Sequence, residues 1–390
     1  MDIHLGDSHR TLRIAFIALA LGMLALTAFM YWHPSIFPMH GFSGPEGYAV
    51  SPANARLTGD SWRYIHGGHA ILHGQPLEEI QRSYLGYCLL CGLAGPGIIF
   101  LQLAFALAAL AALLAIGRRL DGNACAVLAG LLFALNPEFA AWHCAIMTES
   151  IYTSCVCINA FLSLWAMDKA RRWRMPAVFA WIFLTAFLRP TGWIQLPAVL
   201  LLWSCACIQK LKWKAAATAA ILVCHALFSI VFAENGIQQQ SPTIKLYTGE
   251  VVWQEELWRV DMPKADLSKT GLVDGLLYAL RHPLASSWLA LKRLGVMLLR
   301  IRPSYSRMHN LFLLAYHLPI TLLGLAALLL NRRRPAAWAI GAMLAAHALV
   351  VALTFNDNDG RFTLYFTPLL ATAACVFHSL LRSALQRAFP

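Results

Sequence analysis

Residues 96–141 read PGIIFLQLAFALAALAALLAIGRRLDGNACAVLAGLLFALNPEFAA, two apolar runs separated by a short charged connection. The runs occupy about 96–116 and 123–141, close to the roughly 20 residues that an α-helix needs to cross a ~30 Å hydrocarbon layer. Two basic residues, Arg118 and Arg119, lie in the connection. The stretch therefore predicts two membrane-spanning helices joined by a short basic loop.

Apolar runs of similar length recur on both sides of this stretch and bring the expected number of spans to about ten. The other runs lie at residues 13–32, 150–167, 176–192, 193–209, 215–233, 310–330, 337–354 and 362–380. The predicted fold is all-α: a polytopic transmembrane helical bundle with juxtamembrane helices on its outer face. We expect residues 1–390 to form a single integral-membrane domain.

The composition excludes several classes of protein. Of the 390 residues, 59% are hydrophobic and only 13% are charged. An ordinary soluble domain has about 45–50% apolar and about 25% charged residues, so these charges are too few to cover a water-soluble globule. The apolar content is also too high for a disordered chain or a small disulfide scaffold.

The formal net charge of +12 is unevenly divided between the connections. The connections on one side carry sixteen basic and four acidic residues, whereas the other side carries fifteen of each. By the positive-inside rule the basic side is cytoplasmic, and it also holds both chain ends. A nucleic-acid-binding surface would gather its cations in one patch, so no nucleic-acid partner is expected.

Two long connections face outward, at about 33–95 and 234–309. In the first, Asp60 opens a predicted helix over Ser61–His73, and a second short helix is expected over Tyr84–Leu93. The later connection contains an amphipathic run over Trp288–Arg302, which we expect in the membrane interface.

Ionisable groups near the outer ends of apolar segments are costly to place there and are therefore candidates for function. They are scattered between residues 60 and 361, yet one topology places all of them on the outer side. We therefore expect them to form one site. The candidates are Asp60, Arg63, Tyr64, Arg82, His143, Glu149, Arg189 and Arg361.

Several of these candidates have a simpler structural interpretation. Asp60 and Glu149 stand where helices are expected to start, and acidic side chains there cap the helix and suit its dipole. Arg189 and Arg361 can extend to lipid headgroups. The turn-forming sequence Asp357–Gly360 favours a structural role for its two acidic residues.

Motifs for other chemistries are weak or missing. His66, His69 and His73 share one helix face, for which packing or headgroup contacts are the favoured interpretation and a metal site the alternative. The chain has no glycine-rich phosphate loop, no His-Glu-x-x-His helix and no Gly-x-Ser-x-Gly elbow. Nucleotide-driven transport and serine hydrolysis are therefore disfavoured.

The order of these pieces resembles the C-type glycosyltransferase superfamily, in particular bacterial family 39-like enzymes related to protein O-mannosyltransferases and lipid A aminoarabinose transferases. The resemblance runs from about residue 56 to 375. Its matching elements are Gly59-Asp60-Ser61-Trp62-Arg63-Tyr64 with Gly74-Gln75-Pro76, Asn136-Pro137 with Met147-Thr148-Glu149-Ser150, Phe187-Leu188-Arg189-Pro190-Thr191-Gly192, Arg281-His282-Pro283, and Gly360-Arg361-Phe362 with Pro368-Leu369-Leu370.

The resemblance implies transfer of a sugar from a polyprenyl-phosphate carrier to a glycan, lipid or protein acceptor, on the outer face of a bacterial inner membrane. Asp60 would be the catalytic base or the group that orients the acceptor, and inversion at the anomeric carbon is expected. Arg82, Arg189 and Arg361 would stabilise the leaving phosphate, as fixed cations do. No cofactor is assigned and no metal ligand is named, and the resemblance leaves open whether the reaction uses a divalent cation.

The chain departs from this family at two places. Many relatives carry Asp-Glu at the first motif, whereas Asp60 is followed by Ser61. A Lys-Pro-Pro-like stretch of the aminoarabinose transferases is replaced by Arg82-Ser83-Tyr84. The alternatives from other classes are a membrane transporter or lipid flippase, whose buried charges would line a pathway, and a non-catalytic scaffold protein.

Overall fold

The computed structural model describes residues 4–33, 57, 59–167, 173–207, 242–252, 258–302, 305–354, 361–379, 381 and 386. Across these ranges the chain is helical and contains no β-strand, apart from an isolated antiparallel bridge between Glu250 and Arg259. The prediction of an all-α fold is therefore confirmed.

Long and short helices follow one another along the chain. In the first half they are α1 (His4–Trp32), α2 (Gly59–Leu72), α3 (Glu79–Arg82), α4 (Leu85–Ala94), η1 (Gly95–Gly97), α5 (Ile98–Ala134), α6 (Pro137–His143), α7 (Thr148–Ala166), α8 (Met175–Ala186), η3 (Pro190–Ile194) and α9 (Gln195–Cys207). In the second half they are α11 (Pro242–Tyr247), α12 (Leu272–Arg281), α13 (Pro283–Leu299), α14 (Arg307–Phe312), η6 (Leu313–His317), α15 (Leu318–Leu330), α16 (Pro335–Leu353), α17 (Arg361–Leu364) and α18 (Thr367–Ala374).

Within the described ranges, four helical stretches are long and apolar enough to cross a membrane. They are Arg10–Trp32, Leu85–Ala134, Arg307–Leu330 and Pro335–Leu353. These stretches indicate an integral membrane protein, but they do not confirm the expected number of about ten spans. The predicted span at 215–233 lies outside the described residues.

The stretch that contains α5 is not one straight rod. Asp121 and Gly122 leave the helical conformation, and Gly122 has a φ of +82°, in the left-handed region that glycine tolerates best. A Cβ atom added to Gly117 would lie 2.8 Å from the Cα atom of Ala126. In an uninterrupted helix two residues nine positions apart are separated by about 13 Å along the axis, so α5 folds back on itself. The turn falls in the basic connection predicted between the two runs.

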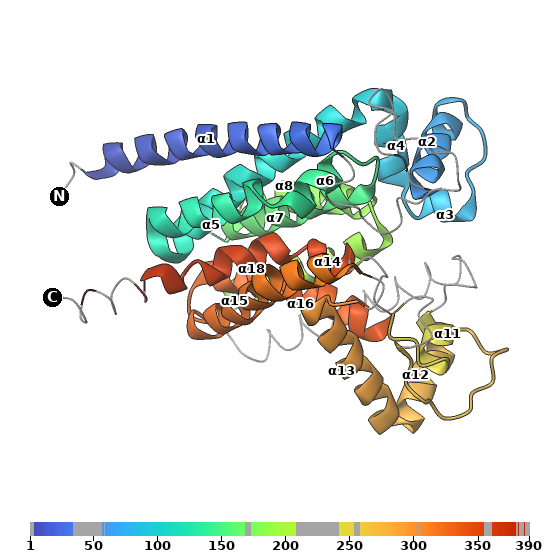
Figure 1. The fold of residues 1–390 in the computed structure, drawn as a ribbon. Coiled ribbons are helices and arrows are strands. Elements are labelled where there is room, and N and C mark those ends of the chain that lie inside the picture. Colours follow the sequence, from blue (N-terminus) through green and yellow to red (C-terminus); the bar gives the residue numbers. More distant parts are fainter. Residues whose placement is uncertain are drawn as a thin grey trace.

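The central layer of the fold is built on this folded helix. α5 packs against α1, α7 and α18, while α16 packs against α7, α9 and α13. Figure 1 shows α1, α5, α7, α16 and α18 running side by side, whereas α13 slants away from them. The buried faces of the two α5 arms carry small residues, such as Ala109 and Ala126, which allow helices to approach closely in a membrane.

Short helices gather at one end of the long ones. Figure 1 shows α2, α3 and α4 together there, with α11 and α12 beyond the same end. α2 and α4 correspond to the two helices predicted in the first outer connection. They meet through Gly68 and Gly92: a Cβ atom on Gly68 would lie 2.5 Å from the backbone nitrogen of Gly92. This close contact sets the position of α2, whose first turn carries Asp60.

The amphipathic run over Trp288–Arg302 forms most of α13 and the residues after it. Its arginines point into the protein, and its position in a membrane interface stays a prediction. Arg293 and Arg300 are buried, the first donating to backbone carbonyls of Lys245 and Glu250 and the second pairing with Glu138. The apolar side chains of Trp288 and Leu291 are exposed instead, because the charged face finds partners inside the protein.

Candidate functional site

Four separate segments bring predicted site residues together. Asp60 lies in the first turn of α2 and Glu149 in the first turn of α7. Arg189 lies between α8 and η3, and Arg361 is the first residue of α17. The chain thus supplies each charge from the end of a helix rather than from its middle. We call these four residues, together with Arg63, the charged cluster.

Arg361 connects the two carboxylates of the charged cluster. Its Nη1 atom lies 3.2 Å from Oδ2 of Asp60 and 3.6 Å from Oε1 of Glu149. Arg63, one helical turn after Asp60, places its Nη2 atom 3.1 Å from Oδ1 of that residue. Both oxygen atoms of Asp60 therefore face a guanidinium group.

Glu149 is held more tightly than Asp60. The Nη1 atom of Arg189 lies 2.6 Å from Oε1 of Glu149 and also donates to the hydroxyl of Thr148 at 2.7 Å. The Thr148 hydroxyl donates to Oε2 at 3.3 Å, and the Tyr365 hydroxyl donates to Oε1 at 3.4 Å. A buried carboxylate is stable only with such partners, because removing a charge from water costs several kcal/mol.

Aromatic rings surround Arg189. Its guanidinium carbon lies 4.9 Å from the ring centre of Tyr365 and 5.9 Å from those of Tyr84 and Phe362, distances at which a cation is attracted to an aromatic face. A guanidinium group is not deprotonated in proteins, and Glu149 supplies the counter-charge that this buried group needs. The guanidinium is therefore charged at any physiological pH.

Tyr64 lies one helical turn after Asp60 and is packed among other aromatic rings. It is buried, and its ring packs against those of Tyr84 at 5.2 Å and Tyr87 at 5.0 Å. Burial, and secondarily the nearby Tyr84, raises the pKa of Tyr64 well above the ordinary value of a tyrosine. Its phenol is neutral, so it shapes the cluster without adding charge.

Accessibility divides the charged cluster into two parts. The side chain of Asp60 is 30% exposed and that of Arg361 is 13% exposed, whereas Glu149 is completely buried. A molecule that approaches from outside thus meets Asp60, Arg63 and Arg361 first. With three guanidinium groups and two carboxylates, the cluster carries one net positive charge and suits an anionic partner.

The contacts disfavour the simpler interpretations of three residues as a helix cap or as lipid-headgroup contacts. No side chain caps α7, and the Glu149 carboxylate bonds to other side chains, which disfavours a capping role. Arg189 and Arg361 point into ion pairs within the protein rather than to lipid headgroups. The acidic residues Asp357 and Asp359 lie outside the described residues.

Two predicted residues lie apart from the cluster. Arg82 is exposed at the end of α3 and forms no ion pair with the residues that the structure describes. His143 is buried at the end of α6, with its Nδ1 atom 2.7 Å from the Ser150 hydroxyl. Burial lowers the pKa of His143 to about 4, so it offers no positive charge at neutral pH. A substrate contact by either residue stays a prediction.

His66 and His69 of α2, and His73 directly after it, are not grouped as metal ligands in the part of the chain described. The rings of His69 and His73 stack at 3.9 Å, and Nδ1 of His73 lies 2.8 Å from the backbone oxygen of His69. Among the described residues, no group of three or more His, Cys, Asp or Glu side chains is placed to hold a metal ion.

Two residues that contact the cluster were missed by sequence reasoning. Tyr365 follows Arg361 by one helical turn, and this spacing could have revealed it. Thr148, whose hydroxyl touches both Arg189 and Glu149, precedes Glu149 directly.

A buried hydrogen-bonded network lies next to Tyr365 and was not predicted either. The Tyr152 ring packs edge-on against Tyr365 at 4.8 Å, and its hydroxyl contacts His347 and Gln195. Gln195 in turn accepts from Asn159. The network joins α7, α9 and α16. It reaches the charged cluster through Tyr365, whose hydroxyl donates to Glu149.

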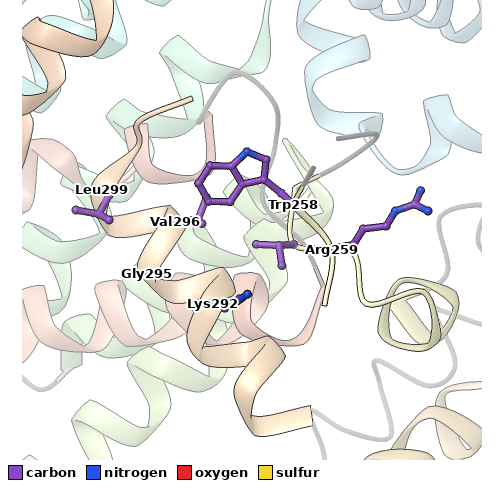
Figure 2. A pocket seen from close by; sticks show the side chains of 7 residues that line it. Trp258, Arg259, Lys292, Gly295, Val296 and Leu299 are labelled. Carbon is purple, nitrogen blue, oxygen red and sulfur yellow. The ribbon is translucent and has the colours of Figure 1, made fainter. Parts of the chain in front are cut away.

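A separate cavity of about 290 Å³ lies between α13 and the residues next to the β-bridge of Glu250 and Arg259. Its lining is Val251, Trp258, Arg259, Lys292, Gly295, Val296 and Leu299, which includes none of the predicted site residues. Figure 2 shows the Arg259 side chain pointing away from Trp258. The cavity walls are mainly apolar, and it is not part of the charged cluster.

Comparisons with known proteins assign no family to the chain. Neither protein-family models nor curated protein sequences give a match. A solved structure similar to this chain is the apo form of the Archaeoglobus fulgidus oligosaccharyltransferase, with 14% sequence identity and a TM-score of 0.49. The match covers 96% of this chain and 51% of the archaeal chain, so this chain spans about half of that protein's length. The functional argument therefore rests on the geometry of the charged cluster.

Proposed function

We propose that the chain is a membrane glycosyltransferase. It moves a sugar from a polyprenyl-phosphate-linked donor to a glycan, lipid or protein acceptor at the outer face of a bacterial inner membrane. The observation that supports this most strongly is the charged cluster: three arginines and two carboxylates from four segments meet near helix ends in a chain with long apolar helices.

The chemistry of the reaction explains the need for cations. Breaking the bond between the anomeric carbon and the phosphate oxygen leaves a negative charge on the departing phosphate. Fixed positive groups stabilise such a charge most effectively when they are already oriented. In this proposal Arg361, which is partly accessible, meets the phosphate, while the deeper Arg189 neutralises Glu149 and keeps it in position.

The second part of the reaction is activation of the acceptor. Asp60 is the accessible carboxylate of the cluster and therefore the group that an acceptor hydroxyl would meet. An entering phosphate would compete for Arg361 and free Oδ2 of Asp60 to accept a hydrogen bond from that hydroxyl. A carboxylate that acts as general base in this way contributes about 10²–10⁴-fold to a rate.

The proposal predicts that Asp60→Asn abolishes transfer while the protein still folds and inserts. The purified chain in detergent is offered a panel of polyprenyl-phosphate sugars, and release of the carrier is followed by mass spectrometry. Asp274→Asn is the matched control, because Asp274 also lies in the first turn of a helix but outside the cluster. The control is expected to retain full activity.

Full activity of a well-folded Asp60→Asn variant would show that Asp60 is not catalytic. Failure of the wild-type chain to turn over any donor, with its fold confirmed, would instead favour transport of a lipid-linked substrate. These two outcomes are distinguishable because the first concerns the variant and the second the wild type.

A further inference from the structure

A single nitrogen atom lies between the two carboxylates of the charged cluster. Nη1 of Arg361 is 3.2 Å from Oδ2 of Asp60 and 3.6 Å from Oε1 of Glu149. Two carboxylate groups that face one point form the common arrangement for binding a divalent cation with oxygen ligands. In this protein that point is occupied by a guanidinium group of the chain itself.

The other contacts of these carboxylates also disfavour a metal ion. Oδ1 of Asp60 faces Arg63, and Oε1 of Glu149 bonds to Arg189. Mg²⁺ requires near-octahedral oxygen ligands at about 2.0–2.1 Å, which these oxygens could supply only by giving up their arginine partners. A dication would also meet like charge from three guanidinium groups, which repels it strongly at such short range. The residues present therefore do not fit a divalent cation.

We infer that Arg361 takes the place of a divalent cation between Asp60 and Glu149, so that the donor phosphate meets a guanidinium group instead of a metal ion. The part of this inference that concerns the phosphate rests on the proposed function, whereas the part that concerns the carboxylates does not. A guanidinium is suited to this place because it is always charged and has five N–H donors in a planar fork. It can therefore hold carboxylates on one side and a phosphate on another.

Direct measurement of Mn²⁺ binding tests the inference. The full-length chain in metal-free detergent solution is titrated with Mn²⁺, and free Mn²⁺ is measured by electron paramagnetic resonance. We expect the wild-type chain to show no binding that depends on Asp60. Arg361→Ala and Arg361→Gln remove the competing charge. Both are expected to bind Mn²⁺ with an affinity at least about tenfold higher than any affinity of the wild-type chain.

Further variants identify the site of that binding. Adding Asp60→Asn to Arg361→Ala should abolish the gained affinity, because one of the two carboxylates is then neutral. Arg361→Lys is the matched control, since it keeps the positive charge and should bind Mn²⁺ no better than wild type. Elution as a single species and an unchanged melting temperature confirm that each variant is folded. If Arg361→Ala is not folded, Arg361→Gln is used in its place.

Two results would overturn the inference. One is Mn²⁺ binding by the wild-type chain that Asp60→Asn weakens. The other is a folded neutral variant at position 361 that binds Mn²⁺ no more tightly than wild type. Neither measurement requires turnover, so a failure of the proposed glycosyl transfer would leave the Mn²⁺ result intact. If transfer is observed, its rate should be the same with and without a chelator.

Discussion

Asp60 and Glu149 are similar side chains in different environments. Both are acidic residues in the first turn of a helix, yet one is partly exposed and the other completely buried. Glu149 bonds to Arg189, Thr148 and Tyr365 and therefore acts as a fixed charge within the protein. Asp60 is partly accessible, and we therefore propose it as the carboxylate that meets an acceptor.

At the residue scale, we predict that Arg361→Ala weakens use of the donor more than use of the acceptor. The KM for the polyprenyl-phosphate sugar is expected to rise roughly tenfold to hundredfold, because a charge-assisted hydrogen bond to phosphate is lost. Initial rates are measured against each substrate in turn, with a chelator present so that a metal ion cannot replace the lost charge.

Arg307→Ala provides the control for this measurement. Arg307 is likewise the first residue of a short helix and is exposed, but it lies outside the cluster. Its substitution should leave both KM values unchanged. An unaltered donor KM and kcat in Arg361→Ala would contradict the assignment of Arg361 to the phosphate.

At the scale of helices, the position of Asp60 depends on how closely α2 approaches α4. The backbones of Gly68 and Gly92 are in contact, and a side chain on either would collide with the other helix. Gly86 is similarly close to the backbone of Phe187, two residues before Arg189. The small residues of α2 and α4 thus place two charged segments next to each other.

Gly68→Ala is expected to lower the melting temperature and the transfer rate together. Its added Cβ atom would lie 2.5 Å from the Cys88 oxygen, which forces α2 away from α4, and such overpacking costs about 1–3 kcal/mol. Thermal unfolding in detergent and the transfer assay check this.

Gly341→Ala is the matched control, because Gly341 lies within α16 with open space around it. Alanine is favoured over glycine in a helix by about 1 kcal/mol, so this variant should be as stable as wild type or more stable. Equal stability of the Gly68 and Gly341 variants would show that the contact between α2 and α4 is not tight.

At the scale of the whole molecule, ion pairs join segments that are distant in the chain. Arg361 reaches Asp60 across 301 positions, and Arg300 forms two contacts with Glu138 across 162 positions. Arg300 adopts a φ of +58°, which is unusual for a residue with a side chain, and its pairing with Glu138 accompanies this backbone conformation at the end of α13. The two halves of the chain are therefore linked by charge as well as by apolar packing.

Breaking the pair between Glu138 and Arg300 is expected to lower stability strongly. Glu138→Gln leaves the Arg300 charge buried without its counter-charge, a change that typically costs about 3–5 kcal/mol. The double variant Glu138→Leu with Arg300→Met removes both charges and should recover part of this loss. Melting temperatures of the wild type, Glu138→Leu, Arg300→Met and the double variant form a double-mutant cycle.

The pair between Arg334 and Asp121 serves for comparison. Its atoms lie 4.0 Å apart and Arg334 is largely exposed, so Arg334→Gln should change stability by less than about 1 kcal/mol. If Glu138→Gln were as mild as Arg334→Gln, the buried pair would not hold the two halves together.

Residue patterns along the chain were sufficient to predict helices and to name the five residues of the charged cluster, although the same set also contained Arg82 and His143, which lie apart from it. The lengths of the apolar runs predicted an all-α fold, and the turn after Leu120 falls where Arg118 and Arg119 interrupt them. Both signals are local, because a helix and its breaks depend on neighbouring residues. The number of spans is not confirmed, since several runs form shorter helices such as α8 and α18.

The partners of each charge could not be read from the chain, because a contact between distant residues depends on how whole helices pack. Alternation of the apolar runs indicated that Asp60, Glu149, Arg189 and Arg361 share one side. Packing of α2 on α4, and of α7 beside the start of α17, then decides that Arg361 lies between the two carboxylates. Side-chain direction within a helix likewise removes His143 from the cluster, because its ring turns inward to Ser150.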